Sequence, residues 1–280
     1  MTIPMQWALR RRMMMAALGS GIDVSALSIT YTGAYTDYGM VTMSDGARYR
    51  LLAFTSSGTL SIEQPVNCEV CVVGGGVHGV RADSAGGGYG GAGAYLKNQS
   101  VSAYNGGSVV VGAAQGISSI GGVSVAAVSG KNGGTGAGNF YFVGTGDGLS
   151  KYPFEDTGYS LWAGKPHCAG GGQGADEREM SDGSIEGYNG GNGGTNGGNG
   201  YSGGSNRVSN PSGGVGGIYG GGDGGDRTTE NGRGRNATYY GSGAGGGGRY
   251  KYSDGHETLG YGGNGYQGIV YMRIPEDQAA

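Results

Sequence analysis

The sequence predicts a mainly β protein, in which a short N-terminal helix and strands precede a glycine-rich β/polyglycine-II sandwich. Glycine supplies 70 of the 280 residues, concentrated in two blocks at residues 74–148 and 170–268. Short β-branched or aromatic runs stand on both sides of these blocks, as strands do. Because glycine has no side chain to bury, hydrogen bonds between backbone groups must hold much of such a chain together.

The region before the first block predicts a helix followed by strands. Pro4 and Gly19 fit the start and the end of a short helix. The apolar run Met13–Leu18 is shorter than the roughly 7–15 residues of an export signal. Turn signals at Asp45-Gly46 and Ser57-Gly58 separate short apolar runs. The strands expected here are Ser28–Thr32, Met40–Met43, Tyr49–Phe54, Thr59–Ile62 and Cys68–Val73.

Further strands are expected within the first block, at Ser108–Val111 and Val123–Val128, and at the end of the chain, at Gly268–Ile274. The blocks lack the glycine at every third position that a collagen helix needs. Tyrosines recur throughout them, unlike in flexible linkers. Polyproline-II-type helices project their N–H and C=O groups sideways, so glycine runs can pack side by side and bond to each other. The blocks therefore predict stacked polyglycine-II helices with surface loops between them.

Charge and cysteine content exclude several classes of protein. A net charge of −3 gives no attraction to nucleic acid or to an anionic membrane, and no apolar stretch approaches the 18 residues of a membrane span. Three cysteines are too few for a disulfide framework. Cys68 and Cys71 would face opposite sides of a strand, so we expect them to pack as apolar residues and not to share a metal ion.

Several motifs resemble ligand sites without their required context. Gly74–Gly79 fits the dinucleotide pattern G-x-G-x-x-G, but no helix can follow it. Gly221–Asp226 starts like a calcium-binding nonapeptide, yet it is not repeated in tandem. The charged run at residues 176–179 is expected to be a solvated loop, and no catalytic constellation occurs. The sequence therefore predicts no enzymatic activity, no catalytic residue, no cofactor and no metal site.

Two stretches carry a family resemblance. Val72–Gly76 ends a strand in three glycines, and Gly262–Ile274 runs from glycine-rich sequence into Gly-Ile-Val-Tyr-Met-Arg. Together with the Gly/Tyr/Asn tracts, they resemble the glycine-rich domains of bacteriophage tail proteins over about residues 60–275. The insert at residues 149–169 departs from that pattern. Related phage adhesins stack polyglycine-II helices into a sandwich and present receptor-binding loops at one end, so the resemblance implies recognition by loops within residues 149–268.

The aromatic residues of these loops suggest which side chains would bind. Tyrosine, asparagine, serine and glycine are also the residues that antibody paratopes favour, because tyrosine offers a large contact area at low entropic cost. The alternative is that the rings seal the glycine layers. The residues expected at the receptor-binding surface are Phe154, Tyr159, Trp162, Tyr239, Tyr240, Tyr250 and Tyr252.

Taken together, the sequence predicts residues 1–65 as an attachment region for other virion tail proteins and residues 66–275 as the glycine-rich domain. We expect a phage tail protein of the virion that binds a host surface protein or glycan noncovalently, with a homotrimer favoured by analogy. Three alternatives stay open: a virion scaffold protein, a secreted or cell-surface Gly/Tyr-rich structural protein, and an RNA-associated protein. For the last, Arg233-Gly234-Arg235 is the only RGG-like segment.

Overall fold

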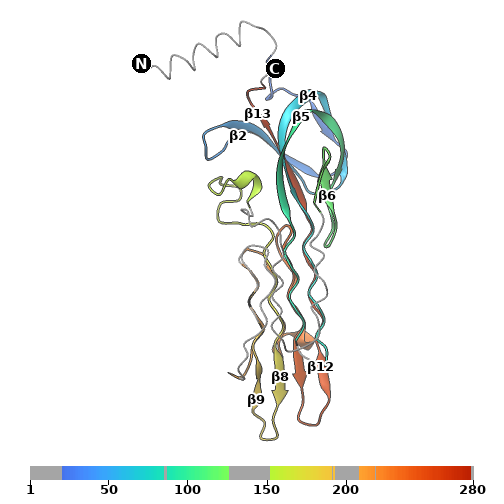
Figure 1. The fold of residues 1–280 in the computed structure, drawn as a ribbon, viewed down its shortest axis with the longest axis vertical. Helices are drawn as coiled ribbons and strands as arrows, with labels where there is room; N and C mark the ends of the chain where they lie inside the picture. Colours follow the sequence, from blue (N-terminus) through green and yellow to red (C-terminus); the bar gives the residue numbers. More distant parts are fainter. Residues whose placement is uncertain are drawn as a thin grey trace, which may run out of the picture.

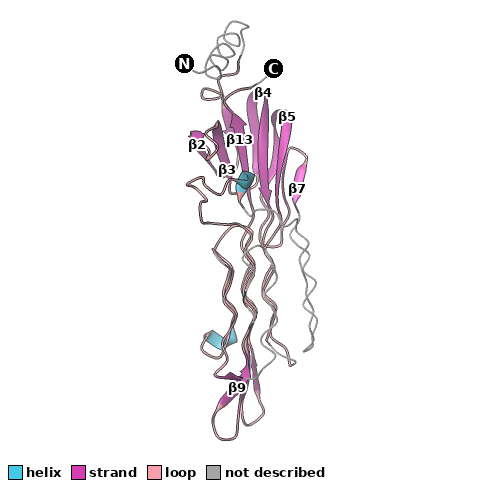
Figure 2. Cartoon of the chain, turned by 60° about the vertical axis from the view of Figure 1, so that its left-hand side comes forward, coloured by secondary structure: helices cyan, strands magenta, loops and turns pink. Residues whose placement is uncertain are grey.

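The computed structural model describes residues 21–84, 87–125, 152–190, 192, 208–217 and 219–278. The protein is mainly β, as the sequence predicts. It is elongated, with a large sheet at one end, a small sheet at the other and long glycine-rich segments between them (Figures 1 and 2). The helix expected between Pro4 and Gly19 lies outside the described residues.

The large sheet has eight strands in the order β2-β3-β13-β4-β5-β6-β7, with β1 paired to β4, and every pair is antiparallel. Its last strand, β13, lies between β3 and β4 and is buried along almost its whole length. The first and last strands of the described chain therefore belong to the same sheet. The strands are β1 (Ile29–Tyr31), β2 (Tyr35–Thr42), β3 (Arg48–Phe54), β4 (Gly58–Val73), β5 (Leu96–Val110), β6 (Ser118–Ile120), β7 (Val123–Val125) and β13 (Ile269–Pro275).

Strand β4 joins two segments that the sequence predicts as separate strands, Thr59–Ile62 and Cys68–Val73. Pro65 lies between them, where the pairing with β5 shifts register. A proline donates no backbone hydrogen bond, and such an irregularity tolerates one. The boundary expected between residues 65 and 66 falls inside this strand, so the large sheet takes strands from both sides of it.

The large sheet carries a hydrophobic cluster on each face. Cys68 belongs to the cluster that contains Phe54 and Met272, whereas Cys71 belongs to the one that contains Trp162. All three cysteines are buried. The prediction that Cys68 and Cys71 face opposite sides of their strand and pack as apolar residues is therefore confirmed.

Between the sheets, the glycine-rich segments are joined by backbone hydrogen bonds, and residues 243–248 lie in the middle. In this segment, N–H groups three residues apart donate to the same neighbouring segment. Gly243 and Gly246 donate to segment 169–172, and Ala244 and Gly247 donate to segment 77–80. Gly245 and Gly248 donate to segment 232–235. The carbonyl groups of these residues accept from three other segments, 88–91, 222–225 and 260–263. All of these bonds are 2.6–3.1 Å long, so this segment is bonded to six others.

This packing leaves no room for a side chain at the glycines of this segment. A Cβ atom at Gly245 would lie 1.7 Å from the carbonyl oxygen of Asp223, and one at Gly246 would lie 1.9 Å from that of Gly88. In both cases the neighbour is backbone, which cannot rotate aside as a side chain can. Glycine is therefore required at these positions by the approach of neighbouring backbones.

The small sheet has five strands in the order β10-β9-β8-β11-β12. Strands β8 and β11 are parallel, and the other pairs are antiparallel. Two short 3-10 helices, η1 (Pro153–Glu155) and η2 (Glu230–Gly232), lie in connecting segments. The strands are β8 (Asp176–Glu179), β9 (Ile185–Tyr188), β10 (Val208–Ser209), β11 (Arg249–Lys251) and β12 (Glu257–Leu259).

Candidate functional site

The aromatic residues expected to form one binding surface lie in different parts of the molecule. Trp162 is fully buried and Phe154 is 8% exposed, and both pack in a cluster against the large sheet. The indole of Trp162 lies 5.4 Å from the ring of Tyr271 and donates its N–H to the carbonyl of Asp156. Tyr159 lies beside Trp162, with 4.8 Å between the ring centroids.

These contacts correct the expectation for the insert. Its largest rings hold it onto the sheet because the apolar face of that sheet needs a cover, and this leaves Trp162 and Phe154 no surface for a receptor. A sequence cannot reveal this burial, since an aromatic residue in a loop has the same local signal whether it faces the solvent or a distant sheet.

Tyr239 and Tyr240 lie in a second aromatic group, around the buried His167. The ring of His167 lies 4.9 Å from that of Tyr239, and its Nε2 is 3.1 Å from the hydroxyl oxygen of Tyr271. Burial raises the pKa of Tyr239 to about 12. These half-buried rings pack against His167, which also contacts Tyr271 of β13, as expected if the rings seal the glycine layers.

Of the seven expected residues, only Tyr250 and Tyr252 lie at the small sheet, and Tyr252 comes directly after its strand β11. Tyr250 lies on β11, and its ring meets that of Tyr252 edge-on at 4.5 Å. Tyr252 also stacks on His256 at 4.0 Å. Two of the seven expected residues therefore lie at the end of the molecule opposite the large sheet (Figures 1 and 2).

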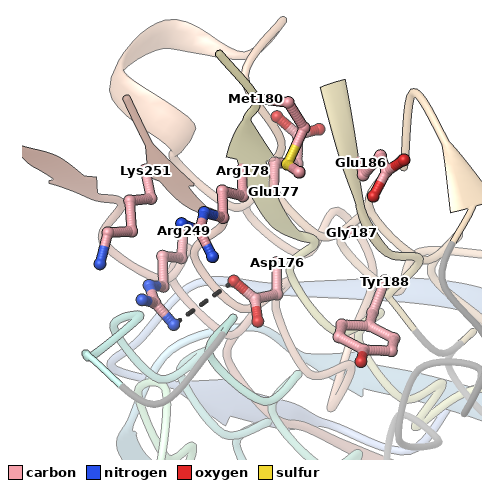
Figure 3. A pocket seen from close by; sticks show the side chains of 9 residues that line it. All are labelled: Asp176, Glu177, Arg178, Met180, Glu186, Gly187, Tyr188, Arg249 and Lys251. Atoms are coloured by element: carbon pink, nitrogen blue, oxygen red, sulfur yellow. Dashed lines mark ion pairs between the residues drawn. The ribbon is translucent and has the colours of Figure 1, made fainter. Parts of the chain in front are cut away.

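The small sheet also forms a hollow that the sequence did not predict. It has a volume of about 170 Å³, and charged side chains dominate its lining (Figure 3). Strands β8, β9 and β11 supply most of this lining. The lining residues are Asp176, Glu177, Arg178, Met180, Glu186, Gly187, Tyr188, Arg249 and Lys251.

The register of the strands explains how these charges come together. Residues two apart on a strand share a face, so Asp176 and Arg178 lie on one face of β8. On β11, Arg249 is in register with Asp176 and Lys251 is in register with Arg178. Asp176 pairs with Arg249 at 3.6 Å, as the dashed line in Figure 3 shows. Glu257 of β12 pairs with Arg249 at 3.0 Å and with Lys251 at 3.7 Å. Opposite charges thus hold most of this face together.

Arg178 differs from the other charged residues of this face. It is exposed, and no hydrogen bond or ion pair engages its guanidinium within the part of the chain that the structure describes. Its register partner on β11 is Lys251, a second cation. On β9 its register partner is Glu186, and Figure 3 shows the three cations gathered on one side of the hollow with Glu186 and Tyr188 on the other.

The other face of β8 carries a buried acid, Glu177, whose side chain is fully buried. One carboxylate oxygen accepts the backbone N–H of Arg227 at 3.2 Å, and the other has no hydrogen-bond partner among the described residues. Burial raises the pKa of this carboxyl to about 7. The expectation of a solvated loop at residues 176–179 is therefore wrong, because these residues form a central strand with one acid in its interior.

A scan against protein-family models and a search of curated proteins give no match for this chain. Within the described ranges, no group of three or more potential metal ligands occurs. The same part of the chain holds no helix that is both long and apolar enough to cross a membrane. Its function has to be inferred from its architecture and its residues.

Proposed function

We propose that this chain is a tail protein of a bacteriophage virion that recognises the host cell surface noncovalently through its small distal sheet. The observation that carries the proposal is the packing of the central segment 243–248, which is hydrogen-bonded to six neighbouring segments. Such packing builds a stiff shaft from backbone alone, and a stiff shaft suits a protein that must hold a binding surface away from its point of attachment.

The proposal includes a polyglycine-II-type sandwich between the two sheets. Donors three residues apart reach the same neighbour, which is the period of a polyproline-II-type helix. The Cβ positions filled by neighbouring carbonyls explain why these segments are glycine. Both features are expected from the resemblance to glycine-rich phage tail domains.

The two ends of the shaft would have different roles. Strands β1 and β13 both lie in the large sheet, so the chain leaves the shaft at that end (Figure 1). We propose that residues 1–65 attach this end to other virion tail proteins, and that the protein assembles as a homotrimer by analogy with phage fibres. The small sheet would then point away from the virion, where it can reach a host surface protein or glycan.

The proposed role is binding without catalysis. In the hollow, opposite charges pair with each other, as in a recognition surface. Tyr250 lies on the opposite face of β11 from Arg249 and Lys251, and its ring contacts that of Tyr252 directly after the strand, so the distal end has two partly buried tyrosine rings on one side and charged side chains on the other. Either face can supply recognition contacts.

Blocking one end of the shaft at a time tests this proposal. A Ser181→Cys variant places a thiol in the exposed turn between β8 and β9, and a Ser100→Cys variant places one on the exposed side of β5 in the large sheet. The natural cysteines are buried, so a bulky polyethylene-glycol maleimide reacts with the new thiol alone. Binding of each labelled protein to a panel of bacterial strains is then measured by flow cytometry.

We expect the label at position 181 to abolish cell binding and the label at position 100 to leave it unchanged. A protein labelled in the distal turn that still binds cells like the unlabelled protein would place recognition elsewhere on the molecule. If the unlabelled protein binds no strain, the receptor-binding proposal fails and a scaffold role in the virion takes its place.

A further inference from the structure

We infer that the hollow of the small sheet binds one anionic sugar residue of a host surface polysaccharide, between the side chains of Arg178 and Lys251. This inference rests on the proposed function and names the class of ligand that the distal sheet would take. It is drawn from the charges of the hollow, the size of the hollow and the character of the surrounding surface.

The first observation is the placement of two cations in register. Arg178 on β8 and Lys251 on β11 are register partners in a parallel pair of strands, so their side chains leave the same face side by side. Like charges directly opposite each other destabilise a sheet. An anion bound between them would replace this repulsion with two charge-assisted contacts.

The second observation is the state of the neighbouring acids. Asp176 pairs with Arg249, and Glu257 pairs with both Arg249 and Lys251. These acids therefore already neutralise part of the positive charge, but Arg178 has no such partner among the described residues. Glu186, the register partner of Arg178 on β9, flanks Arg178 on the side away from Lys251 and would restrict an anion to the side of the cations (Figure 3). The guanidinium of Arg178 remains available, and its planar fork suits a carboxylate or a phosphate.

The third observation is the size and character of the hollow. Its volume of about 170 Å³ is below the roughly 300–1,000 Å³ of pockets that enclose a drug-sized ligand, so it suits one group of a larger molecule. Tyr188 supplies an aromatic ring on the side opposite the cations, where a sugar ring can rest (Figure 3). A single acidic sugar within a chain fits both the charge and the space.

The surrounding surface favours a polysaccharide over a protein. Protein interfaces have an apolar core with aromatic anchors. Of the large hydrophobic side chains that are exposed in the described part of the chain, none belongs to strands β8–β12. A polar, charged and shallow surface is better matched by a hydrated, anionic glycan.

The test uses the full chain and the polysaccharide fraction extracted from a strain that the protein binds. Affinity is measured by biolayer interferometry for the untreated fraction, for the fraction after chemical reduction of its carboxyl groups, and for the fraction after removal of its phosphates. We expect one of the two treatments to abolish binding, and the effective one identifies the carboxylate or the phosphate as the recognised group.

The protein variants are Arg178→Gln and Lys251→Gln, with Lys97→Gln as the matched control. Lys97 is an exposed residue of β5 in the large sheet, so this control removes one positive charge far from the hollow. We expect each hollow variant to weaken binding on the order of tenfold, as for the loss of a charged hydrogen bond, and the control to bind like the wild type. Circular dichroism verifies that each variant is folded.

The outcomes separate this inference from the proposed function. An anionic sugar is refuted as the ligand if the wild-type protein binds cells but not the untreated polysaccharide. It is also refuted if the wild type binds the polysaccharide equally well after both treatments. Cell binding that is lost only after protease treatment of the cells points to a protein receptor and refutes it too. Unchanged affinity in Arg178→Gln and Lys251→Gln places the ligand elsewhere on the distal sheet. Failure of the wild type to bind any strain refutes the proposed function itself.

Discussion

Adding a single methyl group at Gly245 tests whether close backbone packing holds the shaft together. In Gly245→Ala, the new Cβ would lie 1.7 Å from the carbonyl oxygen of Asp223, and ordinary contact begins at 3.4 Å. The separation must therefore double, which only a movement of one backbone segment can achieve. Three backbone–backbone hydrogen bonds of 2.8–2.9 Å meet at these two residues. Two of them join Gly245 to Arg235 and to Gly263, and the third joins Asp223 to Arg235.

The size of the effect follows from what this movement breaks. Forcing an additional methyl group into a packed interior costs about 1–3 kcal/mol. Each buried backbone group that loses its partner adds about 1–3 kcal/mol. With one such group left unpaired, we expect Gly245→Ala to lower the free energy of unfolding by about 4 kcal/mol. At about 3 °C per kcal/mol for a chain of this size, the melting temperature falls by about 12 °C.

Two other glycines serve as controls in the same denaturation experiment. A Cβ at Gly21 meets nothing within 4 Å, so Gly21→Ala should change stability by less than about 0.5 kcal/mol. Gly39 also has open space but a φ of +65°, so Gly39→Ala should cost about 1 kcal/mol through backbone strain alone. A Gly245→Ala variant as stable as Gly21→Ala would refute the reasoning, because it would show that the neighbouring segments can move apart at no cost.

Three further predictions concern buried groups. Burial raises the pKa of Glu177 from its ordinary 4.5 to about 7, so the folded state holds this proton to a higher pH than the unfolded state does. The contribution of this carboxyl to stability should therefore be greatest below pH 4.5 and fall by about 3 kcal/mol as the pH rises to 7. Urea titrations should show this fall in the wild type but not in Glu177→Gln, and equal pH profiles would contradict it. Trp162→Ala should lower the free energy of unfolding by about 4 kcal/mol, because it empties a fully buried site. As a control, Tyr261→Ala at a mostly exposed site should lower it by less than about 0.5 kcal/mol. Equal effects of the two substitutions in a thermal melt would argue against the burial of Trp162. The three cysteines should resist a thiol reagent until the protein unfolds, since all are buried, and rapid labelling of the native protein would contradict their placement.

The sequence by itself showed where glycine dominates and where several strands of the large sheet form. Strand β3 and the closing strand β13 were predicted nearly to their ends, because β-branched and aromatic runs between turn residues are local signals. Strand β5 was predicted only at its end, since polar residues and glycines make up most of it and show little apolar alternation. The same lack of alternation hid β8, whose four residues are all charged.

The tertiary structure alone decided which elements are neighbours. Glycine segments carry no side chains that could specify a partner, so nothing in residues 243–248 shows which six segments surround them. The insertion of β13 between β3 and β4 likewise depends on contacts between residues more than 190 positions apart in the chain. The burial of Trp162 and the hollow around Arg178 depend on such contacts too. Composition and local pattern indicate what kind of structure many segments adopt, whereas register and packing, which set the site, arise only when distant segments meet.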